Sequence, residues 1–261
     1  MKCVCFRKRR KNLKVSELYK KLNEKIPEYL SEDWDNEGLM LCPDPDREAE
    51  KVLFTLDVTE EAADVAVKNG FDLIISHHPL IFTPLKGITD QLLVKLLWSG
   101  ISVFSFHTRF DAMAGGVNDA LCRACGASVS TRGVCDEQLG VIGIYDEPMS
   151  PETLASKVKE CLSSPSVQLA SSGKECRRVA FVGGSGGSSA VSGALDVGAD
   201  ALVSGEIGYN AMLDGMKAGL TVITAGHFST EQPAMKYLED IVRSVTDINA
   251  RQYDCRIIKQ L

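Results

Sequence analysis

Two stretches of this chain follow the same plan, and this repeat constrains the fold more than any other feature of the sequence. Residues 51–78 and 178–206 each contain an apolar strand, a helical stretch, a Gly-x-Asp sequence and a second apolar strand with a serine at its end. Asp72 in the first stretch corresponds to Asp200 in the second. Strands that alternate with helices of this length indicate βαβ units in largely parallel sheets.

The repeat continues downstream. Residues 101–111 correspond to residues 220–231, because each segment is an apolar strand followed by a histidine and, four positions later, an acidic residue. We therefore predict an α/β protein with two lobes related by a weak internal two-fold repeat. The carboxyl ends of the parallel strands in the two lobes would face a common cleft.

We expect three regions along the chain: a basic tail over residues 1–14, a first α/β lobe over 15–125 and a second over 126–261. The apolar spacing in residues 15–26 predicts a helix that Pro27 ends. In the second lobe, the pattern predicts a strand at LGVIGIY and then a helix from about Pro151 to residue 162.

Composition excludes several protein classes. A chain of 261 residues with 44% hydrophobic content can bury a full core. Its apolar stretches are too short to span a bilayer, and its start lacks the apolar core of a secretory signal. The nine cysteines are an odd number at irregular spacing, which favours reduced thiols. We expect a soluble, cytoplasmic protein.

Charge is distributed unevenly. The first sixteen residues hold seven Lys or Arg and no acid, so the rest of the chain has 22 basic against 35 acidic side chains. An acidic body argues against a nucleic-acid surface there, because phosphate binding needs a positive field. The basic tail is interpreted as a solvated, disordered extension. The alternatives are membrane attachment through acylated Cys3 and Cys5 beside the basic run, and organelle targeting.

The chain uses few histidines, and each lies beside an apolar, strand-like run: His77, His78, His107 and His227. Asp111 and Glu231 each stand four positions after a histidine. Imidazole and carboxylate together suit zinc, manganese, iron, cobalt or nickel, whereas calcium and magnesium prefer oxygen-rich sites. Because side chains just past parallel strands can converge at one sheet edge, we predict a metal site there.

The histidine doublet bears on the number of ions. His78 precedes Pro79, which disfavours the helical region and keeps His78 extended. Adjacent residues of extended chain point to opposite sides, so we expect His77 and His78 to project in different directions. That arrangement fits two neighbouring metal ions better than one.

Other motifs allow two interpretations each. The glycine-rich run over residues 183–189 could cradle a phosphate with its backbone amides, although a flexible strand-to-helix turn is the commoner explanation. Cys122 and Cys125 form a single C-x-x-C and are interpreted as two incidental thiols. Glu206 is either a site carboxylate at the position that corresponds to the histidine doublet or part of a surface turn. Residues 34–41 favour an ordinary turn before a strand.

Taken in order, several short motifs resemble one family. WDNEGL, SHHPLIF, HTRFDAMAGGVND, GGSGG, SGE and GHFSTE stand in the order of the Nif-three-like, YbgI-type dinuclear metal-binding family, whose members are often called GTP cyclohydrolase I type 2 homologues. The resemblance runs from about Val15 to the C-terminus. It implies two intertwined α/β lobes with a pair of divalent ions in the cleft, and a ring-shaped homohexamer built from dimers.

The resemblance also implies roles for individual residues. His107 would be a nearby proton-handling residue or would support the ligands from outside the coordination shell. The family's metal ligands correspond here to His77, His78, Asp111, His227 and Glu231. One position departs from the pattern: Asn210 stands in a segment where many relatives have a histidine, which puts a catalytic role for that segment in doubt.

Two functions remain open at this point. The first is a metal-dependent hydrolase in which two ions share a bridging hydroxide that attacks a small-molecule substrate, with GTP cyclohydrolase-type ring opening as the named candidate. The second is a binding protein that carries or senses metal, or that acts as an oligomeric regulatory partner. The same ligands serve either function.

Overall fold

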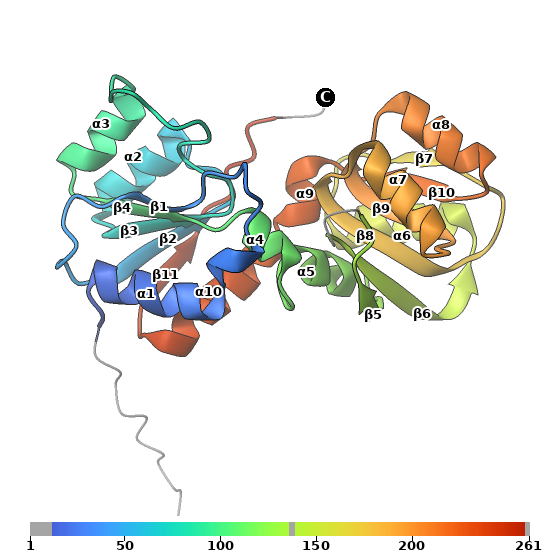
Figure 1. The fold of residues 1–261 in the computed structure, drawn as a ribbon, viewed down its shortest axis with the longest axis horizontal. Coiled ribbons are helices and arrows are strands. Elements are labelled where there is room, and N and C mark those ends of the chain that lie inside the picture. Colours follow the sequence, from blue (N-terminus) through green and yellow to red (C-terminus); the bar gives the residue numbers. More distant parts are fainter. Residues whose placement is uncertain (1–11, 136–138, 259–261) are drawn as a thin grey trace, which may run out of the picture. The chain divides into compact units, whose positions relative to one another are not determined.

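The computed structural model describes residues 12–135 and 139–258, which form two compact α/β units (Figure 1). Unit 1 comprises the described residues up to His107 together with Leu238–Cys255. Unit 2 comprises Thr108–Tyr237 and the described residues from Arg256 onward. The basic tail, with Cys3 and Cys5, lies almost entirely outside the described residues.

Unit 1 is built on a five-stranded sheet in the order β1-β4-β3-β2-β11. Its strands are β1 (Gly38–Leu41), β2 (Lys51–Thr55), β3 (Leu73–Ser76), β4 (Ser102–Ser105) and β11 (Asn249–Gln252). β11, β2, β3 and β4 run parallel, and β1 pairs antiparallel with β4 at the edge. Every residue of β3 and β4 is buried, as expected for parallel strands covered on both faces.

Helices cover both faces of this sheet: α2 and α3 lie on one face, and α1 and α10 on the other (Figure 1). Their bounds are α1 (Val15–Lys25), α2 (Glu60–Asn69), α3 (Gln91–Trp98) and α10 (Ala234–Val245), and a short 3-10 turn, η1, spans Glu28–Leu30. The first helix confirms the one expected before Pro27. Ala63 and Leu96 pack with Ile74 in one apolar layer, whereas Tyr19 contacts the ring of Phe104 on the other face.

Unit 2 contains a six-stranded sheet in the order β5-β6-β8-β9-β10-β7. Its strands are β5 (Ser128–Arg132), β6 (Val141–Met149), β7 (Gln168–Ala170), β8 (Cys176–Ser185), β9 (Ala201–Glu206) and β10 (Thr221–Thr224). β8, β9 and β10 are parallel, and the flanking strands β6 and β7 are antiparallel to their neighbours.

The two faces of this second sheet carry separate apolar clusters. Leu121 of α5 and Val158 of α6 pack with Phe181 on one face, whereas Ala190 of α7 and Met212 of α8 pack on the other. The helices are α4 (Thr108–Ala112), α5 (Val117–Ala124), α6 (Pro151–Cys161), α7 (Gly187–Asp196), α8 (Tyr209–Lys217) and α9 (His227–Glu231). The strand and helix expected before and after Pro151 are therefore confirmed as β6 and α6.

The internal repeat extends to individual hydrogen bonds. The path β2-α2-β3-α3-β4 in unit 1 is repeated as β8-α7-β9-α8-β10 in unit 2. Asp72 accepts hydrogen bonds from two successive backbone amides at the start of β2, at 3.1 and 2.9 Å. Asp200 does the same at the start of β8, at 3.0 and 2.8 Å. Gly70 and Gly198 follow the preceding helices with left-handed φ angles of 64° and 68°, which glycine adopts without strain.

The division of the chain differs from the one expected from the sequence. Residues 108–125 belong to unit 2, because Leu121 and Cys122 on α5 pack into its core. Residues 238–255 return to unit 1, because β11 pairs in parallel with β2. The segments of the two units thus alternate along the chain, as the expected intertwining requires.

The described cysteines are all free thiols. Burial raises the pKa of the Cys122 thiol to about 12 and also raises the pKa of Cys125 well above its ordinary value. Both residues lie in the apolar core of unit 2, which favours the interpretation of C-x-x-C as two structural thiols. Within the described ranges, no helix combines the length and the apolar character needed to cross a membrane.

Candidate metal centre

Three histidines gather at one edge of the unit 1 sheet. His77 and His78 follow β3 and His107 follows β4, and these strands are parallel neighbours, so their carboxyl ends meet. Each imidazole offers one ring nitrogen, and the three nitrogens lie within 4.8 Å of one another, close enough to hold a metal ion. This cluster is called the three-histidine group below.

Hydrogen bonds orient the doublet. The Nδ1 atom of His77 lies 2.8 Å from the backbone carbonyl of Phe106, and that of His78 lies 2.7 Å from Oδ1 of Asp57. Both partners are acceptors, so each Nδ1 carries the proton and each Nε2 carries the lone pair. Histidines that bind metal through Nε2 are oriented by this kind of bond. The donor chemistry therefore fits a divalent ion.

His107 is held in the same way by residues that precede β1. Its Nδ1 atom lies 3.0 Å from Oδ2 of Asp35, whose side chain is fully buried. Its backbone amide donates to Oε2 of Glu37 at 2.5 Å. The segment before β1, expected to be an ordinary turn, thus fixes the position of one imidazole of the three-histidine group.

The expectation that the doublet would diverge is wrong. The rings of His77 and His78 lie 4.9 Å apart, and both contribute to the three-histidine group. The chain bends directly after β3, and the Ser76 hydroxyl donates to the carbonyl of His78 at 2.8 Å. This bend replaces the extended backbone on which the expectation of opposite projections depended.

Unit 2 has its own cluster of potential ligands at the corresponding edge. His227 begins α9, and its Nε2 atom lies 3.2 Å from Oε2 of Glu231 one helical turn later. This contact confirms that the spacing of four brings the two side chains together. On the other side of the ring, Nδ1 of His227 lies 3.5 Å from Oε2 of Glu206, at the end of β9.

A glycine makes room for this cluster. Gly184 has a left-handed φ of 62°, and a Cβ atom there would overlap Oε1 of Glu231 and lie 3.2 Å from Nε2 of His227. Any larger residue would push the buried carboxylate away from the imidazole. The glycine-rich run therefore has a steric role beside the candidate ligands.

Three backbone amides of the same run are already occupied by hydrogen bonds within the protein. The amide of Gly183 donates to Oδ1 of Asn118 at 2.8 Å, and that of Gly184 donates to the hydroxyl of Thr230 at 3.1 Å. The amide of Gly186 donates to the backbone carbonyl at the end of β9 at 3.2 Å. Because these three amides already have partners within the protein, the structure favours the interpretation as a strand-to-helix turn.

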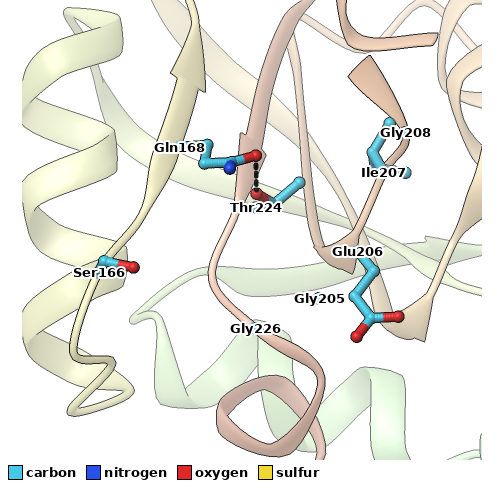
Figure 2. A pocket seen from close by; sticks show the side chains of 8 residues that line it. All are labelled: Ser166, Gln168, Gly205, Glu206, Ile207, Gly208, Thr224 and Gly226. Carbon is cyan, nitrogen blue, oxygen red and sulfur yellow. Dashed lines mark hydrogen bonds between the residues drawn. The ribbon is translucent and has the colours of Figure 1, made fainter. Parts of the chain in front are cut away.

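A pocket of about 370 Å³ opens at the ends of β9 and β10 and reaches Gly226, the residue before His227 (Figure 2). Its wall is formed by Ser166, Gln168, Gly205, Glu206, Ile207, Gly208, Thr224 and Gly226. The Thr224 hydroxyl donates to Oε1 of Gln168 at 3.4 Å within it. Glu206 therefore contacts both the pocket and the His227 ring, which supports the interpretation as a site carboxylate. Asn210 lies exposed on the first turn of α8, outside the lining of the pocket.

The structure distributes the expected ligands over the two units. His77 and His78 lie in unit 1, whereas His227, Glu231 and the half-buried Asp111 of α4 lie in unit 2. The backbone carbonyl of Asp111 accepts a hydrogen bond from the Asn118 side chain at 3.0 Å. A ligand role for Asp111 stays a prediction.

Sequence reasoning missed the carboxylates that hold the imidazoles. Asp35 and Glu37 precede β1, and Asp57 follows β2. One signal was available for Asp57, because an acidic residue just past a buried parallel strand lies at the same sheet edge as the histidines. Asp35 and Glu37 stand in the WDNEGL motif, but nothing in the sequence linked that motif to His107, which lies about 70 positions away.

Comparisons with known proteins find relatives that match almost the whole chain. Residues 13–259 match the family described as Duf34/NIF3 (NGG1p interacting factor 3). The chain is 34% identical to the Protein NIF3 homolog of Schizosaccharomyces pombe over 251 residues, which cover 87% of each protein. It is 31% identical to a GTP cyclohydrolase 1 type 2 homolog of Clostridium acetobutylicum over 238 residues, or 86% and 87% of the two chains.

A solved structure supports the same assignment. The chain resembles the Staphylococcus aureus hypothetical protein SA1388 with a TM-score of 0.87 and 26% identity, covering 96% of this chain and 100% of the other. The similarity confirms the expected α/β fold class with two sheets. Because the family match and the 34% identical relative each extend over most of the sequence, the chain belongs to the Duf34/NIF3 family.

Proposed function

We propose that this protein is a metal-dependent hydrolase whose centre holds two divalent ions. In this proposal, His77 and His78 of unit 1 and the His227–Glu231 cluster of unit 2 supply the ligands, together with Asp111. The observation that carries the proposal is the orientation of the imidazoles in unit 1, where each Nδ1 atom lies against an oxygen acceptor. Such bonds leave Nε2 as the donor atom for a metal.

Divalent ions held there would supply Lewis acidity, which polarises a substrate oxygen and lowers the pKa of water. The protein supplies the geometry. Asp57 and Asp35 fix the ring planes of His78 and His107, and Gly184 keeps the Glu231 carboxylate beside His227. These contacts hold the donor atoms before any ion arrives, which lowers the cost of ordering them on binding.

His107 is the proposed proton-handling residue. Its Nδ1 proton is held by the fully buried Asp35 carboxylate, so Nε2 is the atom that takes up or releases a proton. A fixed tautomer suits this role, because the same nitrogen must meet the substrate in each turnover. The neighbouring imidazoles His77 and His78 are the proposed ligands.

The proposed substrate class comes from the relatives. Several of them carry the name GTP cyclohydrolase 1 type 2 homolog, which makes a purine nucleotide the first compound to test. Hydrolysis at a ring carbon is within the chemistry that Lewis-acid centres promote. A non-hydrolytic carrier or sensor of metal is the alternative that the experiment must separate from an enzyme.

The test combines metal analysis with turnover. Protein purified without chelator is loaded with Zn²⁺, Mn²⁺, Fe²⁺, Co²⁺ or Ni²⁺, and the bound metal is measured by plasma mass spectrometry. Turnover is then followed by chromatography on a panel of phosphoesters, amides and nucleotides that includes GTP. We expect about two ions per chain and hydrolysis of one substrate class. Fewer than about one and a half ions per chain would contradict the two-ion centre.

Two variants separate an enzyme from a carrier. His107→Gln should retain the bound metal and lower kcat by about 100-fold or more, because general acid-base groups contribute roughly 10²–10⁴-fold. Glu231→Gln should lower both metal affinity and kcat. A carrier would show altered metal exchange in both variants and no turnover of any compound in the wild-type protein.

A further inference from the structure

Two aromatic rings lie open to solvent beside the three-histidine group. Trp34 and Phe82 are each 57% exposed, and their ring centroids are 6.1 Å apart at an interplanar angle of 45°. The His107 ring lies edge-on to both, 6.1 Å from Trp34 and 6.4 Å from Phe82. The rings of these three residues therefore form one continuous surface at the sheet edge.

The backbone that carries these rings is held firmly, although the rings themselves are exposed. Asp35 and Glu37, which follow Trp34, hydrogen-bond the side chain and the backbone of His107. Between them, the Asn36 side chain donates to the carbonyl of Ile81, next to Phe82. The bonds that orient His107 thus also fix where Trp34 and Phe82 stand.

Such an arrangement is typical of a ligand surface. Contact between an apolar ring and water is unfavourable, so covering the ring with another apolar group lowers the free energy. Exposed apolar patches beside polar groups often mark binding sites. The area of two side chains is far below that of a stable protein–protein interface. A flat ring, however, can stack on one or both of them and still reach the imidazole edge of His107.

We propose that Trp34 and Phe82 form the stacking surface for a planar heteroaromatic group of the substrate, such as a purine base. The ring would lie against the aromatic pair with an edge towards His107. The choice of a purine rests on the proposed function, whereas the stacking itself depends only on the exposed rings.

The two tryptophans of the chain permit a direct test. Trp98, at the end of α3, is 89% exposed and serves as the matched reporter. In Trp98→Phe protein the fluorescence comes from Trp34 alone, and in Trp34→Phe protein it comes from Trp98 alone. Each is excited at 295 nm and titrated with guanosine, with GTP and with ribose 5-phosphate, once in EDTA and once after loading with Zn²⁺.

We expect saturable quenching of Trp34 by guanosine and GTP in at least one metal state, and only weak, linear quenching of Trp98. Ribose 5-phosphate, which lacks an aromatic ring, should leave both reporters unchanged. In the Trp98→Phe background, Phe82→Ala should weaken guanosine binding about 10-fold or more. Leu85→Ala removes another exposed apolar side chain of the same segment and should leave the binding constant unchanged.

Linear quenching of both reporters in both metal states would overturn the stacking proposal, as would an equal loss of binding in Leu85→Ala. These outcomes are separate from those of the proposed function. Turnover without quenching of Trp34 would retain the hydrolase and reject the stacking surface. Saturable quenching without turnover or bound metal would retain the surface and reject the hydrolase.

Discussion

The two units place different chemistry on the same scaffold. After β3 and β4, unit 1 presents three imidazoles, whereas after β9 and β10, unit 2 presents one imidazole and the carboxylates of Glu206 and Glu231. The strand and helix order is the same in both, down to the aspartate that caps the first strand. The repeated scaffold therefore fixes the positions of the functional side chains at the strand ends, whereas the residue types at those positions differ between the units.

The units also support their side chains differently. In unit 1, the histidine rings are held by hydrogen bonds of 2.7–3.0 Å, including one to the fully buried Asp35. In unit 2, Nδ1 of His227 lies 3.5 Å from Oε2 of Glu206, whose side chain is 61% exposed. The position of Glu231 depends instead on the space that Gly184 leaves. Unit 1 therefore provides the more rigid donors.

The largest effect is expected from His77→Asn. The Asn side chain can still donate to the carbonyl of Phe106 but lacks the Nε2 donor atom. We expect Zn²⁺ affinity in isothermal titration calorimetry to fall by more than about 100-fold, beyond the roughly 10–100-fold typical of supporting residues. A thermal unfolding curve checks that the fold is retained. Unchanged affinity in a folded variant would remove unit 1 from the metal centre.

A glycine pair tests how unit 2 holds its carboxylate. Gly184 and Gly187 have φ angles of 62° and 59°, but only at Gly184 would a Cβ atom meet Glu231. Gly187→Ala should lower the free energy of unfolding by about 1 kcal/mol, from the backbone strain alone. Gly184→Ala should lower it by about 2–3 kcal/mol and also weaken metal binding. Urea titrations measure the free energy of unfolding of both variants. Equal losses of stability in the two variants would refute the steric role of Gly184.

The supporting carboxylates should rank by their geometry. Asp57→Asn leaves His78 with a neutral partner, and we expect metal affinity to fall about 10–100-fold. Glu206→Gln removes a longer and more exposed contact to His227, so the loss should stay below about 10-fold. Calorimetric titrations of both variants with the same ion make the comparison. A reversed order would show that unit 2 is the more firmly held half.

The smallest effect concerns the core thiols of unit 2. Burial raises the pKa of Cys122 from 9.0 to about 12, so the folded protein retains a proton that the unfolded chain releases. Stability from this group is therefore full below pH 9 and declines as the pH rises towards 12. Urea titrations at pH 8 and pH 10 should show a smaller alkaline loss of stability in Cys122→Ala than in wild type.

Iodoacetamide labelling of the native protein gives a second readout on these thiols. At pH 8, peptide mapping should find the exposed Cys161 modified and Cys122 protected. Thiolate is the reactive form, and both burial and the raised pKa suppress it at Cys122. Rapid labelling of Cys122 would contradict its place in the core.

The elements of the fold were largely predictable, because their signals are local. Apolar periodicity and Pro27 were enough to predict α1, and Pro151 marked the start of α6. The repeat of βαβ units was visible because glycine and aspartate recur at equivalent turns. Pairing between β11 and β2 was not predictable, because the two strands are about 200 positions apart and neither strand specifies its neighbour.

In the candidate site, too, local features were predictable from the sequence and long-range contacts were not. The sequence by itself determined which side chains are chemically able to bind metal, since four scarce histidines and two acids stand just past buried strands. The helical spacing of His227 and Glu231 also followed from local geometry. Only the tertiary structure decided which ring nitrogen of each histidine in unit 1 is free to bind metal, because the acceptors Asp35, Asp57 and the Phe106 carbonyl come from other loops. It also decided that His77 and His78 lie together, because a bend after β3 replaces the extended chain.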